Sequence, residues 1–129
     1  MTDTTATRVT GIINIAVPVS DHERALAFYT GTLGFEVRRD ATFGPGMRWV
    51  EVAPPGAATT IALAPPGEIK PGIETGIRVG TPDATRTHSE LRAAGANVDA
   101  EIMRFGGPVP PMFYVRDPDG NRIVIVETA

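Results

Sequence analysis

Residues 9–35 read VTGIINIAVPVSDHERALAFYTGTLGF and hold the pattern that decides the fold. From Val9 to Val19 apolar side chains recur at every second position, and this period of two predicts a strand. Asp21 then supplies an N-cap, so a helix is expected over His22–Leu33. Gly34 ends that helix, because glycine readily takes the left-handed conformation found after a helix C-terminus.

Three further strands are expected in the first half of the chain, separated by turns rich in glycine and proline. They are Phe35–Arg39, Met47–Ala53 and Thr59–Ala64. The first half therefore reads as one strand, one helix and three strands.

The second half repeats this order. It contains an expected strand at Glu74–Gly80, a helix at Ala84–Ala94, and strands at Asn97–Phe105, Met112–Arg116 and Asn121–Glu127. The interval between the helix caps Asp21 and Asp83 equals the interval between the strand residues Ile61 and Ile123. An ordinary α+β domain with coincidental spacing is the alternative to such a repeat.

We predict an α+β fold in which a flexible tail at residues 1–8 precedes one domain at residues 9–129. Two tandem βαβββ modules, at about 9–67 and 72–129, make up this domain.

Composition excludes several classes of function. Of the 129 residues 42% are hydrophobic, which is enough for a packed core. The net charge of −3 and the absence of a basic cluster argue against nucleic acid as a partner. There is no cysteine, so thiolate metal sites and cysteine nucleophiles are excluded. No apolar run has the length of a signal peptide core or a membrane span, and a cytoplasmic protein is expected.

Three sequence segments resemble one known family. They are VPVSD at 17–21 with ALAFY at 25–29, LRAAG at 91–95, and YVRDPDGN at 114–121. Together they are similar to the glyoxalase/bleomycin resistance/dioxygenase group, also called the vicinal oxygen chelate superfamily. The resemblance implies that both modules form a curved mixed sheet around a small-molecule cavity, and that the protein is a homodimer. The family includes lyases, isomerases, dioxygenases and drug-binding proteins, so the fold alone assigns no function.

The resemblance also places a divalent metal ion on four strand positions. In this sequence those positions are Asn14, Ala62, Gly76 and Val124. Glycine, alanine and valine side chains hold no ligand atom, and one amide oxygen is a weak donor. We therefore predict no metal and no cofactor, with a site built from Asn14 and Glu74 as the alternative. His22 and His88 are expected to be surface or helix-packing residues.

Alternation from these positions predicts the residues that bind a ligand. They are Asn14, Trp49, Ala62, Arg78, Met112, Tyr114 and Val124. The facing of Trp49 and Glu51 depends on register, because a slip of one residue would reverse it. Trp49 and Tyr114 either line a pocket or fill a collapsed core.

Three functions are compatible with this sequence. The first is a metal-free small-molecule binding protein that resembles the bleomycin-resistance branch and holds an apolar or aromatic ligand. The alternative is an enzyme of the same superfamily, a lyase, isomerase or dioxygenase, with or without a metal. Its candidate catalytic residues are Glu51 or Glu74 as a general base with a raised pKa, and Tyr114 or Arg78 as a group that holds an oxyanion. The third is a domain that only associates with another chain. A small-molecule ligand and a second copy of the chain are the expected partners, without nucleic acid or membrane.

Overall fold

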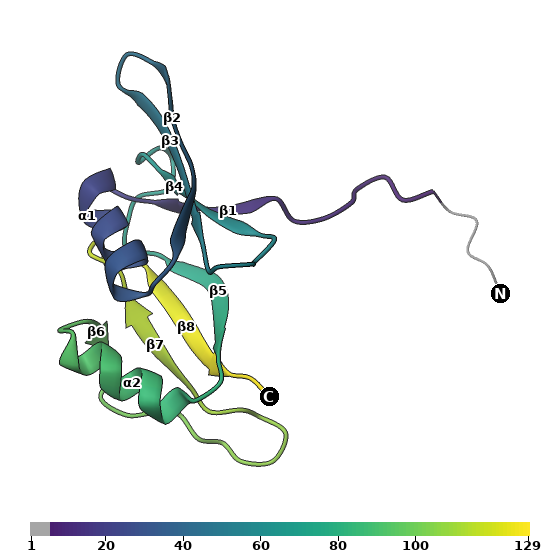
Figure 1. The fold of residues 1–129 in the computed structure, drawn as a ribbon, viewed down its shortest axis with the longest axis vertical. Coiled ribbons are helices and arrows are strands. Elements are labelled where there is room, and N and C mark those ends of the chain that lie inside the picture. The colour runs from purple at the N-terminus through teal and green to yellow at the C-terminus, as the bar shows by residue number, and fades with distance from the viewer. Residues whose placement is uncertain (1–5) are drawn as a thin grey trace.

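Two four-stranded sheets, each covered on one face by a helical segment, form the computed structural model, which describes residues 6–129 (Figure 1). Their strand orders, β1-β4-β3-β2 and β5-β8-β7-β6, are the same. In each sheet the first and last strand of the module are parallel neighbours, and the other pairs are antiparallel. The α+β class and the two βαβββ modules are thus confirmed. Of the tail predicted at residues 1–8, residues 1–5 lie outside the described residues.

The first module follows the predicted order. Its strands are β1 (Asn14–Pro18), β2 (Glu36–Gly44), β3 (Met47–Ala53) and β4 (Thr60–Ala64). The side chain of Asp21 accepts hydrogen bonds from the backbone N–H groups of Glu23 and Arg24, which confirms the predicted cap of helix α1 (His22–Leu26).

The predicted helix His22–Leu33 is present but changes its winding halfway. After α1 it continues as a π-helix, η1 (Ala27–Thr32). The hydroxyl of Thr30 donates to the carbonyl of Leu26 at 2.6 Å, and the N–H of Leu33 bonds the carbonyl of Phe28, five residues back, at 3.0 Å. A side-chain donor that occupies the carbonyl four residues earlier competes with the α-helical bond there, which accounts for the wider turn.

Three strand boundaries differ clearly from the prediction. The strand expected from Val9 begins only at Asn14. The carbonyls of Ile12 and Ile13 still accept hydrogen bonds from Thr59 and Thr60, and the residues before them extend away from the sheets (Figure 1). The strand expected at Asn97–Phe105 is reduced to β6 (Asn97–Val98). The cause lies at the next residue, because one carboxylate oxygen of Asp99 accepts the backbone N–H of Tyr114 at 3.2 Å, in place of a ladder carbonyl. β2 is longer than expected and runs on to Gly44.

The second module contains α2 (Ala84–Ala93) and three further strands of its sheet. They are β5 (Glu74–Thr81), β7 (Met112–Arg116) and β8 (Arg122–Glu127). Asp83 caps α2 through the N–H of Arg86, as predicted. The side chain of Glu127 accepts the backbone N–H of Ala84 at 3.1 Å. A carboxylate at this end of a helix stabilises it.

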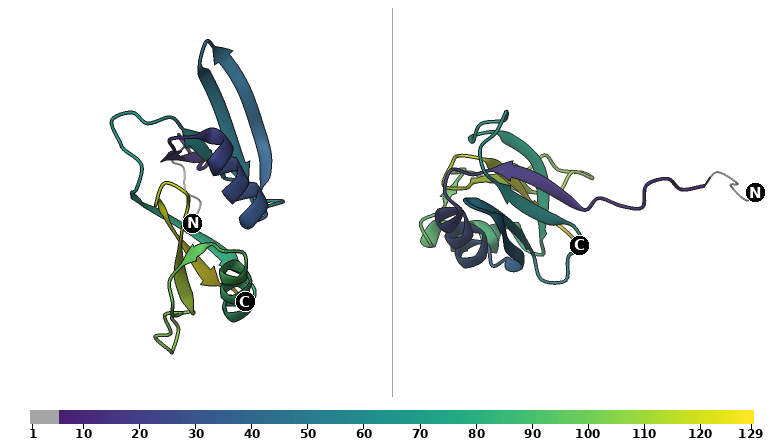
Figure 2. Two further views of the ribbon diagram at one scale, coloured as in Figure 1. Left: turned by 90° about the vertical axis from the view of Figure 1, so that its left-hand side faces the viewer. Right: turned by 90° about the horizontal axis from the view of Figure 1, so that it is seen from above.

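A single buried core connects the modules. It contains Val17, Val50 and Leu63 from the first module and Leu91 and Phe113 from the second. Both helical segments lie on the same side of the molecule, so the other face of each sheet is left open (Figure 2). None of the helices within residues 6–129 combines the length and apolar character that crossing a bilayer requires.

Histidine packing agrees with the prediction. His88 is buried on α2, with its ring 4.9 Å from that of Phe113 and Nε2 2.6 Å from the carbonyl oxygen of Asp99. His22 lies 2.8 Å from the carbonyl oxygen of Leu63. Both rings therefore contribute to helix packing.

The turn between β7 and β8 links the second module to the first. The amide of Asn121, which is fully buried, donates to the carbonyl of Pro18 at 2.8 Å and to the carboxylate of Asp117 at 2.9 Å. The hydroxyl of Tyr29 donates to that same carboxylate at 3.0 Å. Burial, followed by the nearby charge of Asp117, raises the pKa of Tyr29, so its hydroxyl remains a donor.

Replacing Asn121 with alanine should destabilise the whole chain. Its amide oxygen also accepts the N–H groups of Gly72 and Ile73, so Asn121→Ala leaves several buried polar groups unpaired. We expect a loss of about 2–4 kcal/mol in the free energy of unfolding. Urea denaturation followed by circular dichroism measures this loss. Asn97→Ala, at an exposed asparagine, is the matched control, and equal stability of the two variants would contradict the prediction.

Candidate functional site

The open face of the first sheet carries the residues predicted for the first half of the cavity. Because paired residues share a face, the register Asn14–Thr60, Ala16–Ala62 and Glu51–Ala62 places these side chains together. Trp49, two residues from Glu51, lies on the same face. We call this surface the first open face.

Three side chains on the first open face form a hydrogen-bonded set. The indole N–H of Trp49 donates to one carboxylate oxygen of Glu51 at 2.6 Å, and the hydroxyl of Thr60 donates to the other at 2.6 Å. These two donors, Thr60 first, hold the pKa of the Glu51 carboxyl below its ordinary value. The indole of Trp49 is therefore fixed in orientation by an ionised carboxylate.

The open face of the second sheet carries the other predicted residues. The register pairs Val124 with Arg78 on one side and with Tyr114 on the other, and pairs Met112 with Val126. A bulge between Glu74 and Arg78 keeps both side chains on this face. Gly76 lies within the bulge at a φ of +73°, a conformation that other residues rarely adopt. We call this surface the second open face.

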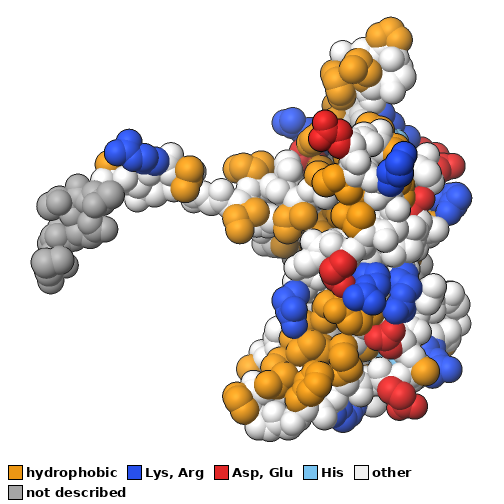
Figure 3. Space-filling model, turned by 180° about the vertical axis from the view of Figure 1, so that it is seen from behind, with side chains coloured by type: hydrophobic (Ala, Val, Ile, Leu, Met, Phe, Trp, Pro, Cys, Tyr) orange, Lys and Arg blue, Asp and Glu red, His pale blue; other side chains and the backbone are white. Residues whose placement is uncertain are grey.

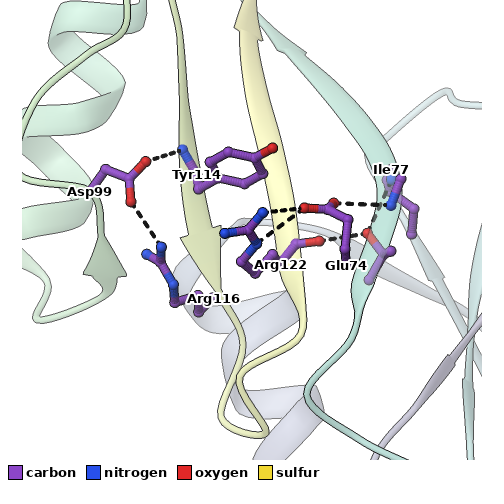
Figure 4. Close-up of polar contacts among 8 residues, drawn as sticks. Glu74, Ile77, Asp99, Tyr114, Arg116 and Arg122 are labelled. Carbon is purple, nitrogen blue, oxygen red and sulfur yellow. Dashed lines mark hydrogen bonds and ion pairs between the residues drawn. The ribbon is translucent and has the colours of Figure 1, made fainter. Parts of the chain in front are cut away.

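Charged side chains on the second open face are paired across its strands (Figure 4). Arg122 forms an ion pair with Glu74 at 2.7 Å, and its guanidinium lies 4.1 Å from the centre of the Tyr114 ring. Arg116 pairs with Asp99 at 2.9 Å. The Arg122 guanidinium lowers the pKa of Glu74, and Glu74 in turn raises that of Arg122.

The seven predicted ligand-binding residues thus fall into two groups. Asn14, Trp49 and Ala62 lie on the first open face, and Arg78, Met112, Tyr114 and Val124 lie on the second. Within one chain the two sheets remain separate. No strand of one sheet packs closely along a strand of the other in the described part of the chain. The described residues of one chain therefore do not bring the two groups together around one closed cavity.

A separate groove of about 430 Å³ lies between the modules, next to the two helical segments. Residues from Thr32 to Phe35 and from Val79 to Pro82 line it, together with Leu91. None of the seven predicted residues belongs to it. The groove lies where the two modules meet, and it is separate from the surfaces that carry the predicted residues.

Sequence reasoning overlooked three residues of the site. Alternation along β8 would have placed Arg122 on the second open face, since it is two residues from Val124. Thr60 was a strand residue without an assigned role, although it lies next to Asn14 in the sheet. No sequence pattern indicated a role for Asp99, because its position depends on the path of the chain after β6.

The pKa shifts of the two candidate catalytic carboxylates are opposite in direction to the shift that a general base needs. Glu51 and Glu74 are both held below the ordinary pKa by hydrogen-bond donors, whereas the general-base hypothesis requires a raised pKa. Residues 6–129 contain no cluster of three or more His, Cys, Asp or Glu side chains placed to hold a metal ion.

Comparisons with known proteins agree on one family. The model of the Glyoxalase/Bleomycin resistance protein/Dioxygenase superfamily matches residues 11–125. The uncharacterized protein YetH of Bacillus subtilis (strain 168) is 30% identical over 117 residues, which cover 88% of this chain and 94% of YetH. The resemblance identified from the sequence is thereby confirmed.

Two solved structures are similar over nearly the whole chain. TnmS3, an antibiotic binding protein from Streptomyces sp. CB03234, has a TM-score of 0.82 and 31% identity, covering 96% of this chain and all of its own. A member of the same superfamily from Sphaerobacter thermophilus DSM 20745 has a TM-score of 0.82 and 35% identity, covering 95% of this chain and all of its own.

The emission of Trp49 should report the protonation of Glu51. Trp49 is the only tryptophan, and its indole is bonded to this carboxylate. Because the folded-state pKa is lowered, the stability that Glu51 contributes is present above the ordinary value of 4.5 and is lost as the pH falls through the lower, folded-state value. We expect a fluorescence transition with a midpoint below 4.5, while circular dichroism still reports a folded chain.

Glu51→Gln serves as the control, because its amide oxygen still accepts the indole N–H but does not titrate in this range. That variant should show no such transition. A midpoint above 4.5 in the unaltered protein would contradict the prediction and restore Glu51 as a candidate base.

Proposed function

The chain belongs to the glyoxalase/bleomycin resistance protein/dioxygenase superfamily, and on that premise we propose that it binds an apolar or aromatic small molecule without transforming it and without a metal ion. The observation that carries this proposal is the set of Trp49, Glu51 and Thr60 on the first open face. Both oxygens of this carboxylate are held by hydrogen-bond donors, and its lowered pKa makes it a weak base. The role of Glu51 in this proposal is to orient the indole of Trp49 on the binding surface.

The side chains at the family's metal positions support the metal-free part of the proposal. Ala62 and Val124 have no ligand atoms, and Gly76 has no side chain. These three residues are small and apolar, and the fourth position, Asn14, offers a single amide oxygen, which is a weak donor. A surface of this kind, edged by a few oriented polar groups, suits a drug-sized ligand. The similarity to TnmS3, described as an antibiotic binding protein, supports the same class of function.

We further propose that a second copy of the chain closes the cavity. The outer edges of β1 and β5 have no strand partner within residues 6–129, because each pairs only with its parallel neighbour. The segment before β1 exposes large apolar side chains, with Ile12 and Ile13 at 70% and 73% exposure. Free strand edges and exposed apolar side chains are features that association buries.

Ligand binding is tested by titrating the protein with a panel of aromatic antibiotics while Trp49 emission is recorded. We expect one class of compound to saturate the signal at one ligand per chain and to be recovered unchanged by mass spectrometry, also after treatment with EDTA. Tyr114→Ala should weaken the binding about fivefold, from a loss of about 1 kcal/mol of aromatic contact. Tyr114→Phe keeps the ring and should bind normally. Conversion of the ligand, or binding that requires added metal, would contradict the proposal.

Association is tested by sedimentation. The unaltered protein should sediment at twice the 13.7 kDa mass of the chain. The double variant Ile12→Asp and Ile13→Asp should shift it toward a single chain, because both side chains are exposed in the monomer and the change leaves the core intact. Thr10→Asp adds a charge to the same segment at a polar position and is the control. A monomer in the unaltered protein would refute the proposed dimer.

A further inference from the structure

The second open face has an excess of positive charge, although the chain as a whole has a net charge of −3. Three arginines contribute to this face, one from each of β5, β7 and β8: Arg78, Arg116 and Arg122. Seen from the side opposite the helices, hydrophobic side chains form a patch on the second module, and lysine or arginine side chains lie beside it (Figure 3).

Two of these arginines are neutralised by carboxylates. Arg116 pairs with Asp99, and Arg122 pairs with Glu74 (Figure 4). Their orientations are fixed by these contacts. They shape the face without adding net charge to it.

Arg78 differs from them. Among residues 6–129 its side chain has no carboxylate partner, and its one hydrogen bond is to the sulfur of Met112 at 3.4 Å. A thioether sulfur is a weak acceptor. The guanidinium thus keeps most of its five donors for an outside group, and its planar fork suits a carboxylate or sulfonate.

The surroundings of Arg78 are apolar and aromatic. It is paired in the sheet with Val124, which is paired in turn with Tyr114. Val124 and Met112 are buried, whereas Tyr114 is half-buried, so a ligand whose ring system contacts Tyr114 lies within reach of the guanidinium. Apolar contact and charge complementarity occur at the same place.

From this juxtaposition we propose that the ligand is an aromatic anion, a planar ring system carrying one acidic group that Arg78 binds. This inference rests on the proposed binding function and specifies the class of ligand. It predicts that the acidic group, and not only the aromatic body, determines affinity.

Two dyes with the same skeleton test the inference. 8-Anilinonaphthalene-1-sulfonate carries a sulfonate, whereas N-phenyl-1-naphthylamine is the same ring system without it, and both fluoresce when bound. We expect the sulfonate to bind the full chain about tenfold more tightly than the neutral dye. Higher salt concentration should reduce this difference in affinity, because salt screens the attraction between the sulfonate and the solvent-exposed guanidinium of Arg78.

Arg78→Gln should abolish the preference for the sulfonate and leave the affinity for the neutral dye unchanged. Arg86→Gln, on the exposed surface of α2, removes the same charge elsewhere and should keep the preference. Equal affinity for both dyes in the unaltered protein, or a preference that survives in Arg78→Gln, would overturn the inference and leave the binding function standing. Failure of both dyes to bind would instead remove the proposed binding function together with the inference.

Discussion

The buried pair Asp117 and Asn121 is the constraint on which the rest of the structure depends. This pair lies in the turn between β7 and β8, yet it bonds Tyr29 and the end of β1 in the other module. A polar group buried without partners is costly, so all of these contacts must form together. The turn therefore fixes how the second module sits against the first, and both helical segments lie on one side as a result.

This placement leaves the sheet faces opposite the helices open, and each open face is organised within its own sheet. Trp49 is held by Glu51 on one face, and Tyr114 lies beneath Arg122 on the other. Side chains that are already held in place lose little freedom when a ligand binds. In the proposed dimer, these two rigid faces would enclose the ligand.

Much of this arrangement is predictable from the sequence, because it depends on short-range patterns. Period-two alternation located β3 and β7, and Asp21 and Asp83 marked the helix starts. The sequence could not give the direction of the pKa shift of Glu51, because that shift depends on Thr60, a residue of the neighbouring strand. It also did not show that β6 ends after two residues, since that depends on the side chain of Asp99 bonding Tyr114. The arrangement of the site depends on side-chain contacts between neighbouring strands, which the pattern of a single strand does not reveal.

The hydrogen bonds that make Glu51 a weak base are also the ones that suit the first open face to the proposed binding function. A catalytic carboxylate must be free to take a proton, whereas a carboxylate that orients an indole must keep both oxygens occupied. Ala62 lies opposite Glu51 in the sheet and, with only a methyl group, leaves room for this network. A glutamate at that position would instead place a second negative charge opposite Glu51, and the like charges would repel each other. Ala62 therefore offers no ligand atom and adds no charge opposite the carboxylate that orients Trp49.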